Sequence, residues 1–196
     1  MSSILIAPLS SSPQRSDDLA RLLIEVVADG GSVGFMHPLA YDSAQRFWRD
    51  ALAAADRGAR IVLAAFESDT LVGTVSLLLD CPPNQPHRAE LAKMMTHPSH
   101  RGRGIAAALV GEAERLAARH RRSLLVLDTA SEQGAAGFYE KLGYTRAGEI
   151  PDYALKPHGG LTGTVLFWKR LGALADATAF PPRAGHDRDD RAQAQA

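Results

Sequence analysis

The sequence predicts one α/β domain of the α+β type, built on a mixed sheet, and three observations lead to this fold class. First, the chain has 196 residues, of which 45% are hydrophobic, enough for one domain with a sizeable core. Second, β-rich runs and segments of helical periodicity follow one another in the order β-α-α-β-β-β-α-β-α-β-β. Third, the run Ser123–Asp128 is almost wholly apolar, as expected of a buried strand that is central or parallel.

The first predicted elements are a strand and a helix. Residues 3–9 alternate as a strand, and Ser12 followed by Pro13 is typical of an N-cap with proline at the first helical position. Apolar residues at helical spacing then define a core-facing stripe of Leu19, Leu22, Leu23, Val26 and Val27. The glycine-rich segment 29–34 ends this helix in a flexible loop.

A second helix is predicted after that loop. Asp42 and Gln45 have the spacing of a capping box, which marks its start, and Gly58 closes it. The helical periodicity comes from Ala44, Phe47, Trp48, Ala51, Leu52 and Ala55.

Three strands and a loop are predicted next. The β-rich runs 60–67 and 71–79 are separated by Ser-Asp-Thr, which indicates a hairpin. The segment 81–87 contains three prolines and is therefore a loop, because proline cannot donate to a sheet ladder. Residues 89–96 form the next strand.

A glycine-containing turn follows this strand and opens a long helix. Residues 97–106 read His-Pro-Ser-His-Arg-Gly-Arg-Gly-Ile-Ala. Gly102 and Gly104 lack a Cβ, so the backbone can approach a ligand and direct several N–H groups at it, and the helix dipole favours an anion there. Arg101 and Arg103 add charge and forked donors. The turn is predicted to hold a pyrophosphate, although an ordinary helix start with exposed arginines has the same pattern.

The remaining elements are two helices and two strands. The long helix has a predicted buried face of Ile105, Ala108, Leu109, Ala113, Leu116 and Ala117. A short helix, 134–142, ends at Gly143, and strands are predicted near 144–155 and 162–170. Residues 172–196 lack periodicity and are predicted to be a flexible tail, which leaves 1–171 as the folded domain.

Composition excludes several classes of function. The formal net charge is zero, from 22 basic and 22 acidic residues, so the chain has no overall attraction to nucleic acid or to an anionic membrane. No stretch approaches the about 20 apolar residues of a membrane span, and we expect a soluble cytoplasmic protein. Cys81 is the only cysteine, which fits a reducing compartment. The histidines lack ligand spacing, so no metal site is expected.

Two separated motifs resemble those of the GNAT N-acetyltransferases. Arg101, Gly104 and Ala106 match the Arg/Gln-x-x-Gly-x-Gly/Ala signature of their pyrophosphate loop. A second segment matches Ala-x-x-Phe-Tyr-x-x-x-Gly-Phe/Tyr through Ala135, Phe138, Tyr139, Leu142, Gly143 and Tyr144. Glu132 departs from the pattern, because the family usually has asparagine there. Within the family, the segments 29–37, 90–95 and 151–158 look most like those of the tabtoxin-resistance acetyltransferases, which acetylate the amine of a β-lactam toxin.

The resemblance implies a GNAT fold and a binding site for acetyl-CoA. The fold is a mixed, mostly antiparallel sheet of six to seven strands, with helices on both faces and a V-shaped split between the fourth and fifth strands. The pyrophosphate would contact the turn Arg101, Gly102, Arg103, Gly104, Ile105 and Ala106. The pantetheine amides would add alongside Met94, Met95 and Thr96 like another strand. A β-bulge near Met94 or Met95 would free a backbone N–H for the thioester oxyanion.

Three side chains are candidates for catalysis. Glu90 and Asp128 lie on the two strands that the family splays apart, and either is a candidate for the base that takes the proton of the amine. The alternative for Glu90 is a surface charge on an edge strand, and for Asp128 a helix cap or turn contact. Tyr139 matches the family position that donates to the leaving sulfur, and its alternative is a packed tyrosine with a satisfied hydroxyl.

The acceptor is less well defined by the sequence. Phe35, in the loop 34–37, is a candidate for the roof of the acceptor pocket, and Trp48 either walls that pocket or belongs to the core of its helix. A cluster of Asp80, Glu90 and Asp128 would favour a cationic acceptor, such as a small primary amine or an amino-acid-like toxin. Acetylation of protein amines and a non-catalytic acyl-CoA sensor remain open alternatives, as does the choice between monomer and homodimer.

Overall fold

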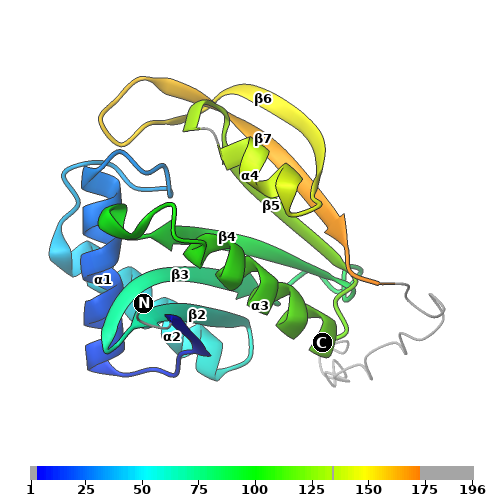
Figure 1. Cartoon of the computed structure of the whole chain (residues 1–196), viewed down its shortest axis with the longest axis horizontal. Helices are drawn as coiled ribbons and strands as arrows, with labels where there is room; N and C mark the ends of the chain where they lie inside the picture. The colour runs from blue at the N-terminus through cyan, green and yellow to red at the C-terminus, as the bar shows by residue number, and fades with distance from the viewer. Residues whose placement is uncertain (1–3, 134, 173–196) are drawn as a thin grey trace, which may run out of the picture.

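The computed structural model describes residues 4–133 and 135–172, whose strands form one seven-stranded sheet in the order β1-β2-β3-β4-β5-β7-β6 (Figure 1). All neighbours are antiparallel except β4 and β5, which are parallel. The strands are β1 (Ile4–Pro8), β2 (Arg60–Glu67), β3 (Thr70–Leu78), β4 (Arg88–Thr96), β5 (Leu124–Ala130), β6 (Thr145–Leu155) and β7 (Leu161–Arg170). The predicted fold class and element order are therefore confirmed.

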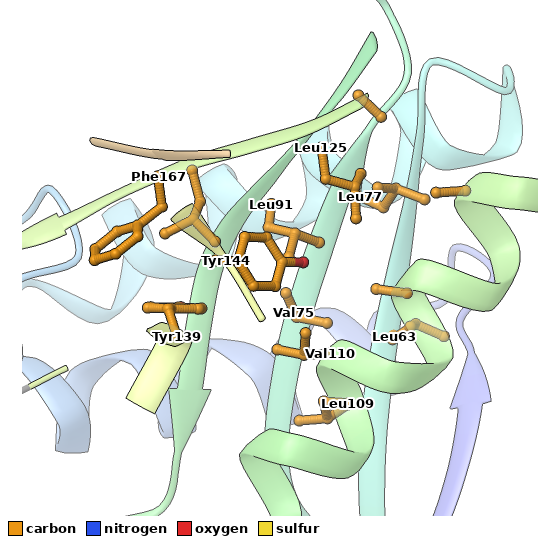
Figure 2. Packing of buried hydrophobic residues seen from close by; sticks show 14 of the residues in the cluster. Leu63, Val75, Leu77, Leu91, Leu109, Val110, Leu125, Tyr139, Tyr144 and Phe167 are labelled. Carbon is orange, nitrogen blue, oxygen red and sulfur yellow. The ribbon is translucent and has the colours of Figure 1, made fainter. Parts of the chain in front are cut away.

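Helices cover both faces of the sheet, as expected (Figure 1). On one face, α1 (Pro13–Ala28) and α2 (Tyr41–Asp56) pack on β2, β3 and β4, and the fully buried Trp48 lies in this layer. On the other face, α3 (Ile105–Arg119) and α4 (Ala135–Lys141) cover a larger apolar cluster that includes residues of every strand from β2 to β5 and of β7 (Figure 2). Short 3-10 turns, η1 (Pro98–His100) and η2 (Ser131–Gln133), precede α3 and α4.

The predicted N-cap of α1 is confirmed, whereas that of α2 is not. The Ser12 hydroxyl accepts a hydrogen bond from the Arg15 N–H at 3.2 Å, and the predicted leucine and valine stripe is buried. The capping box predicted for α2 is wrong, because the N-cap is Ala40 and it makes no side-chain cap. The helix begins one residue before Asp42, which places that carboxylate inside the first turn, where it complements the helix dipole.

Two further local expectations need correction. Ala108 is exposed, and Val110 occupies the buried face of α3 instead, at 1% exposure. Asp128 is not the last residue of its strand, because β5 continues through Ala130, held by antiparallel pairing with β7. The carboxylate therefore lies along the strand and is exposed on it.

The sheet splits between β4 and β5. The two strands pair at only three positions, Arg88 with Leu124, Ala89 with Leu125 and Glu90 with Val126, and then diverge (Figure 1). Beyond Glu90, β4 pairs only with β3, and β5 beyond Val126 pairs only with β7. This is the V-shaped gap expected between the fourth and fifth strands.

No helix among the described residues is long and apolar enough to cross a membrane. Parts of three expectations lie outside the described residues: Ser3 in the predicted first strand, Gly134 in the predicted helix 134–142, and residues 173–196 of the predicted tail.

Candidate active site

The β4 strand carries the predicted bulge at the point where it leaves β5. Thr74 of β3 pairs with Met95 and Ser76 with Ala92, so Lys93 and Met94 together oppose Val75. Lys93 has φ of +53°, a conformation that L-residues seldom adopt and that is found at some β-bulges. The extra residue takes a backbone N–H out of the regular ladder, next to the gap.

A glycine turn connects β4 to α3 and exposes the N-terminus of that helix. Gly102 and Gly104 have φ of +76° and +79°, and a Cβ built on either meets no atom within 4 Å, so the space above both backbones is open. Gly104 is the N-cap of α3 in the left-handed conformation. The first N–H groups of a helix have no partner within it, and the dipole is positive there, so this turn fits an anion.

The first cavity runs from this turn into the gap and has a volume of about 520 Å³. Its lining includes all three predicted β4 residues, Met94, Met95 and Thr96, together with Arg101, Ala106 and Tyr139. The Thr96 hydroxyl is buried and has no hydrogen-bond partner within residues 4–133 and 135–172. An elongated ligand with an anionic end and hydrogen-bonding amides fits this cavity, as acetyl-CoA would.

The two arginines of the turn differ. Arg101 lines the first cavity, and its Nη1 lies 2.5 Å from the Asp29 carboxylate. Arg103 lines neither this cavity nor the second one described below, and it pairs with Glu67 at the end of β2. Glu67 also lies 3.2 Å from the His100 Nε2, so it ties Arg103 and the η1 turn to β2. Of the predicted pair, only Arg101 faces the ligand space.

A second cavity, of about 270 Å³, lies on the other side of the bulge. Both catalytic carboxylate candidates, Glu90 and Asp128, line it from opposite sides of the gap. Met94, Thr129 and Tyr139 line both cavities, so the two spaces meet at the bulge. A group carried in the first cavity and a group bound in the second would come together there.

Tyr139 is held at this junction by aromatic packing. The residue is 5% exposed, and its ring centroid lies 5.0 Å from that of Phe138. The centroids of Tyr144 and Phe167, which Figure 2 shows in the same cluster, lie 5.7 Å and 5.9 Å from it. Burial raises the pKa of Tyr139 to about 12, and the negative charge of Asp128 acts in the same direction. The phenol therefore keeps its proton across the neutral and mildly alkaline range.

The two carboxylates have different surroundings. Asp128 accepts a hydrogen bond at 3.1 Å from the hydroxyl of Thr164, a residue of β7 that is 3% exposed. This contact orients Asp128 toward the cavity and replaces the cap or turn contact that was the alternative interpretation. Glu90 lies 3.4 Å from the Arg88 Nη1, so part of its charge is already compensated.

The candidate acceptor residues do not all come together. Trp48 is fully buried against α1 and the sheet, so it belongs to the core and does not wall the acceptor pocket. Asp80 is exposed beyond the end of β3 and lines neither cavity, so the expected carboxylate cluster reduces to Glu90 and Asp128. Phe35 packs edge-on against Phe47 at 5.2 Å, with its ring centroid 5.9 Å from the Lys93 Nζ, and it lines neither cavity.

Sequence reasoning missed two features of the second cavity. One is Lys93, whose only signal was a lysine in an otherwise apolar stretch of β4. The other is the loop after α1, which lines this cavity through Ser32, Val33 and Gly34. The loop is tied to the turn after β6, because the His37 N–H donates to the Pro157 carbonyl at 2.9 Å and its ring lies 4.5 Å from that of His158. The His158 Nε2 in turn lies 3.0 Å from the Ala28 carbonyl.

Glu132, the departure from the expected asparagine, pairs with Lys156 Nζ at 2.9 Å. It therefore links η2 to the turn between β6 and β7. No group of three or more metal-ligating side chains occurs in the described part of the chain.

Comparison with known proteins identifies the family. The model of the acetyltransferase (GNAT) family matches residues 25–144, which contain the glycine turn, both carboxylates and Tyr139. The chain belongs to the GNAT acetyltransferase family. Human N-acetyltransferase 8B is 37% identical over 87 residues, which are 43% of this chain and 38% of the human protein.

Solved GNAT structures share the fold. A putative acetyltransferase from Salmonella typhimurium, solved with its cofactor acetyl-CoA, superposes with a TM-score of 0.72 at 17% identity and covers 89% of this chain and 99% of its own. An aminoglycoside 6'-N-acetyltransferase complexed with coenzyme A gives 0.67 at 20% identity, with 88% and 99% covered. At such identities the likeness concerns the fold, and the tabtoxin-resistance subtype is not confirmed by it.

Proposed function

We propose that this GNAT protein transfers the acetyl group of acetyl-CoA to the primary amine of a small molecule, an amino-acid-like toxin or antibiotic being the preferred class. The observation that carries the proposal is the meeting of the two cavities at the bulge of β4. The first cavity ends at an anion-binding turn, and the second contains carboxylates. The loop after α1 lines the second cavity through Ser32, Val33 and Gly34 and is tied to the turn after β6 by the His37 contacts, which favours a small acceptor over a peptide.

In this proposal the turn and Arg101 hold the pyrophosphate, and Met94 to Thr96 accept the pantetheine amides alongside β4. The acetyl carbonyl then lies at the bulge, where a backbone N–H stabilises the oxyanion that develops on attack. Preorganised donors of this kind contribute most when they point at the charge that forms during the reaction.

Asp128 is the proposed base. It lies in the second cavity, is oriented by Thr164, and is near enough to Tyr139 to raise the pKa of that phenol. It takes one proton of the acceptor ammonium, directly or through water, and the neutral nitrogen forms its bond to the acetyl carbon. As the bond from carbon to sulfur breaks, the nitrogen loses a second proton, which the departing thiolate receives through water, so that the products are the amide and free coenzyme A. Glu90 adds negative charge beside the amine.

Tyr139 is proposed to stabilise the departing sulfur. With a pKa of about 12, its phenol is a weaker acid than an ordinary thiol, whose pKa is about 8.5, so full proton transfer to the thiolate is uphill. A hydrogen bond from the phenol to the developing thiolate needs no such transfer. Such a bond to a charged group contributes roughly 1.5–3 kcal/mol, or about a 10- to 100-fold effect on kcat.

The test measures thiol release from acetyl-CoA with a panel of small amines, and acetyl-CoA affinity by calorimetry. We expect Asp128→Asn and Tyr139→Phe to lower kcat by about 10-fold or more with little change in acetyl-CoA affinity. Arg101→Met should weaken acetyl-CoA at least several-fold, whereas the matched Arg103→Met should leave its affinity nearly unchanged, since Arg103 faces Glu67.

Two outcomes would overturn the proposal. Absence of acetyl-CoA binding would remove the assignment of the first cavity. Binding without thiol release for any amine would instead favour a non-catalytic acyl-CoA sensor.

A further inference from the structure

Lys93 is a cation in the wall of the second cavity, and the proposed reaction leaves it without a role. It belongs to the bulge itself, one residue before Met94, and lines the same cavity as Glu90 and Asp128. An amine acceptor arrives as a cation, so a fixed positive charge in its pocket is unfavourable unless the acceptor also carries negative charge.

The side chain of Lys93 is held by two aromatic rings and by the loop after α1; Gly34 of that loop lines the second cavity, whereas Phe35 and Phe47 do not. Its Nζ lies 5.9 Å from the ring centroid of Phe35 and 5.8 Å from that of Phe47, within the range of cation–π attraction. On a third side, a Cβ added at Gly34 would lie 3.2 Å from Nζ, so the backbone of the loop abuts the ammonium. These contacts limit the positions that the ammonium can take.

The ammonium has no ion-pair partner in residues 4–133 and 135–172. Burial lowers the pKa of Lys93, and the nearby guanidinium of Arg60 on β2 lowers it further. The charges of Asp128 and Glu90 act in the opposite direction, but neither forms a salt bridge with it. A partly desolvated cation without an ion-pair partner favours binding of an anion, because the attraction between the two charges offsets the solvation free energy that the cation lost on burial.

The charged side chains of the cavity come from both strands beside the gap, with Glu90 and Lys93 on β4 and Asp128 on β5. Asp128 is on β5 and Lys93 on β4, and both line a space of about 270 Å³. We propose that Lys93 is a specificity-determining residue, whose ammonium binds an anionic group, such as a carboxylate, of the amine acceptor. The acceptor is then a small molecule with an amine near Asp128 and an anion near Lys93. This inference rests on the proposed function and extends it from the reacting amine to the other end of the acceptor.

A purely structural role is the competing explanation. In that case Lys93 fills space over Phe35 and Phe47, and methionine, with a similar length and no charge, replaces it without changing acceptor preference. The two explanations differ in one measurable ratio, the affinity for an acceptor with a carboxylate relative to its uncharged amide.

The experiment uses the full chain saturated with coenzyme A. The probes are ω-amino acids with two to five methylene groups between amine and carboxylate, each compared with its own carboxamide, because the distant amine then has nearly the same basicity in both. Calorimetry gives the affinities, and thiol release from acetyl-CoA gives KM and kcat for the same pairs. Wild-type protein, Lys93→Met and Lys93→Arg are compared, with melting temperatures to establish that each variant is folded.

We expect at least one acid to bind wild-type protein about 10-fold or more tightly than its amide. The ratio should fall to near one in Lys93→Met and be largely kept in Lys93→Arg, and the change should fall on KM more than on kcat. A wild-type protein that binds no acid better than its amide would overturn the proposal, as would a Lys93→Met variant that keeps the preference. If acids bind preferentially but no amine releases thiol, the role of Lys93 in binding stands and the proposed acetyl transfer fails.

Discussion

Replacing Tyr139 by phenylalanine should make the protein more resistant to alkaline unfolding. Burial raises the pKa of this phenol from 10.0 to about 12, and Asp128 adds to the shift. An acid with a raised folded-state pKa ionises more readily in the unfolded chain, so its contribution to stability is complete below pH 10 and is lost as the pH rises toward 12. A shift of about two pKa units corresponds to about 3 kcal/mol in full, and to about 2 kcal/mol by pH 11.5.

The assay is urea unfolding of wild-type protein and Tyr139→Phe at pH 9 and pH 11.5, followed by circular dichroism. Groups common to both proteins, including Tyr144, whose pKa burial also raises, largely cancel in the comparison. We expect the free energy of unfolding to fall by about 2 kcal/mol more in wild-type protein than in the variant. Tyr153 is 58% exposed, and Tyr153→Phe serves as the control that should follow wild-type protein. Parallel losses for wild-type protein and Tyr139→Phe would refute the argument that burial holds this phenol neutral.

Two further predictions concern α3. Gly104→Ala should lower the free energy of unfolding by roughly 1–2 kcal/mol, because its φ of +79° strains any residue with a Cβ although no atom lies within 4 Å of the added methyl. The matched change Gly111→Ala, inside the helix and equally unobstructed, should raise it by up to about 1 kcal/mol, and equal effects of the two in urea unfolding would contradict this assignment. Leu109→Ala should lower the free energy of unfolding by about 2–5 kcal/mol, because this side chain of α3 is fully buried against the sheet. A melting temperature close to that of wild-type protein would contradict this packing.

Sequence reasoning was most successful where a local pattern has one physical solution. The helical stripe from Leu19 to Val27 has to face a core, and the β-rich runs before and after the Ser-Asp-Thr turn are typical of a hairpin. The glycine turn before α3 was predicted for the same reason, because only residues without a Cβ adopt the φ values found at Gly102 and Gly104 without strain.

It was less successful where the answer depends on contacts between distant segments. The orientation of Arg103 is decided by Glu67, which is 36 residues away, and the surroundings of Asp128 by Thr164 on β7. Asp80 was grouped with Glu90 and Asp128 by charge alone, and the end of β3 carries it away from them. The capping box at Asp42 failed by two residues, since the N-cap is Ala40, a shift that helix boundaries commonly show.

The short pairing between β4 and β5 has a mechanical consequence. With three residue pairs along that seam, strands β1 to β4 and strands β5 to β7 form two slabs that are hydrogen-bonded to each other only near one end. A ligand bound between them would set the angle between the two parts of the sheet. It would also form hydrogen bonds to strand edges that have no strand partner there. The open end of the gap would then be rigid while the ligand is bound and would become more flexible each time the ligand leaves.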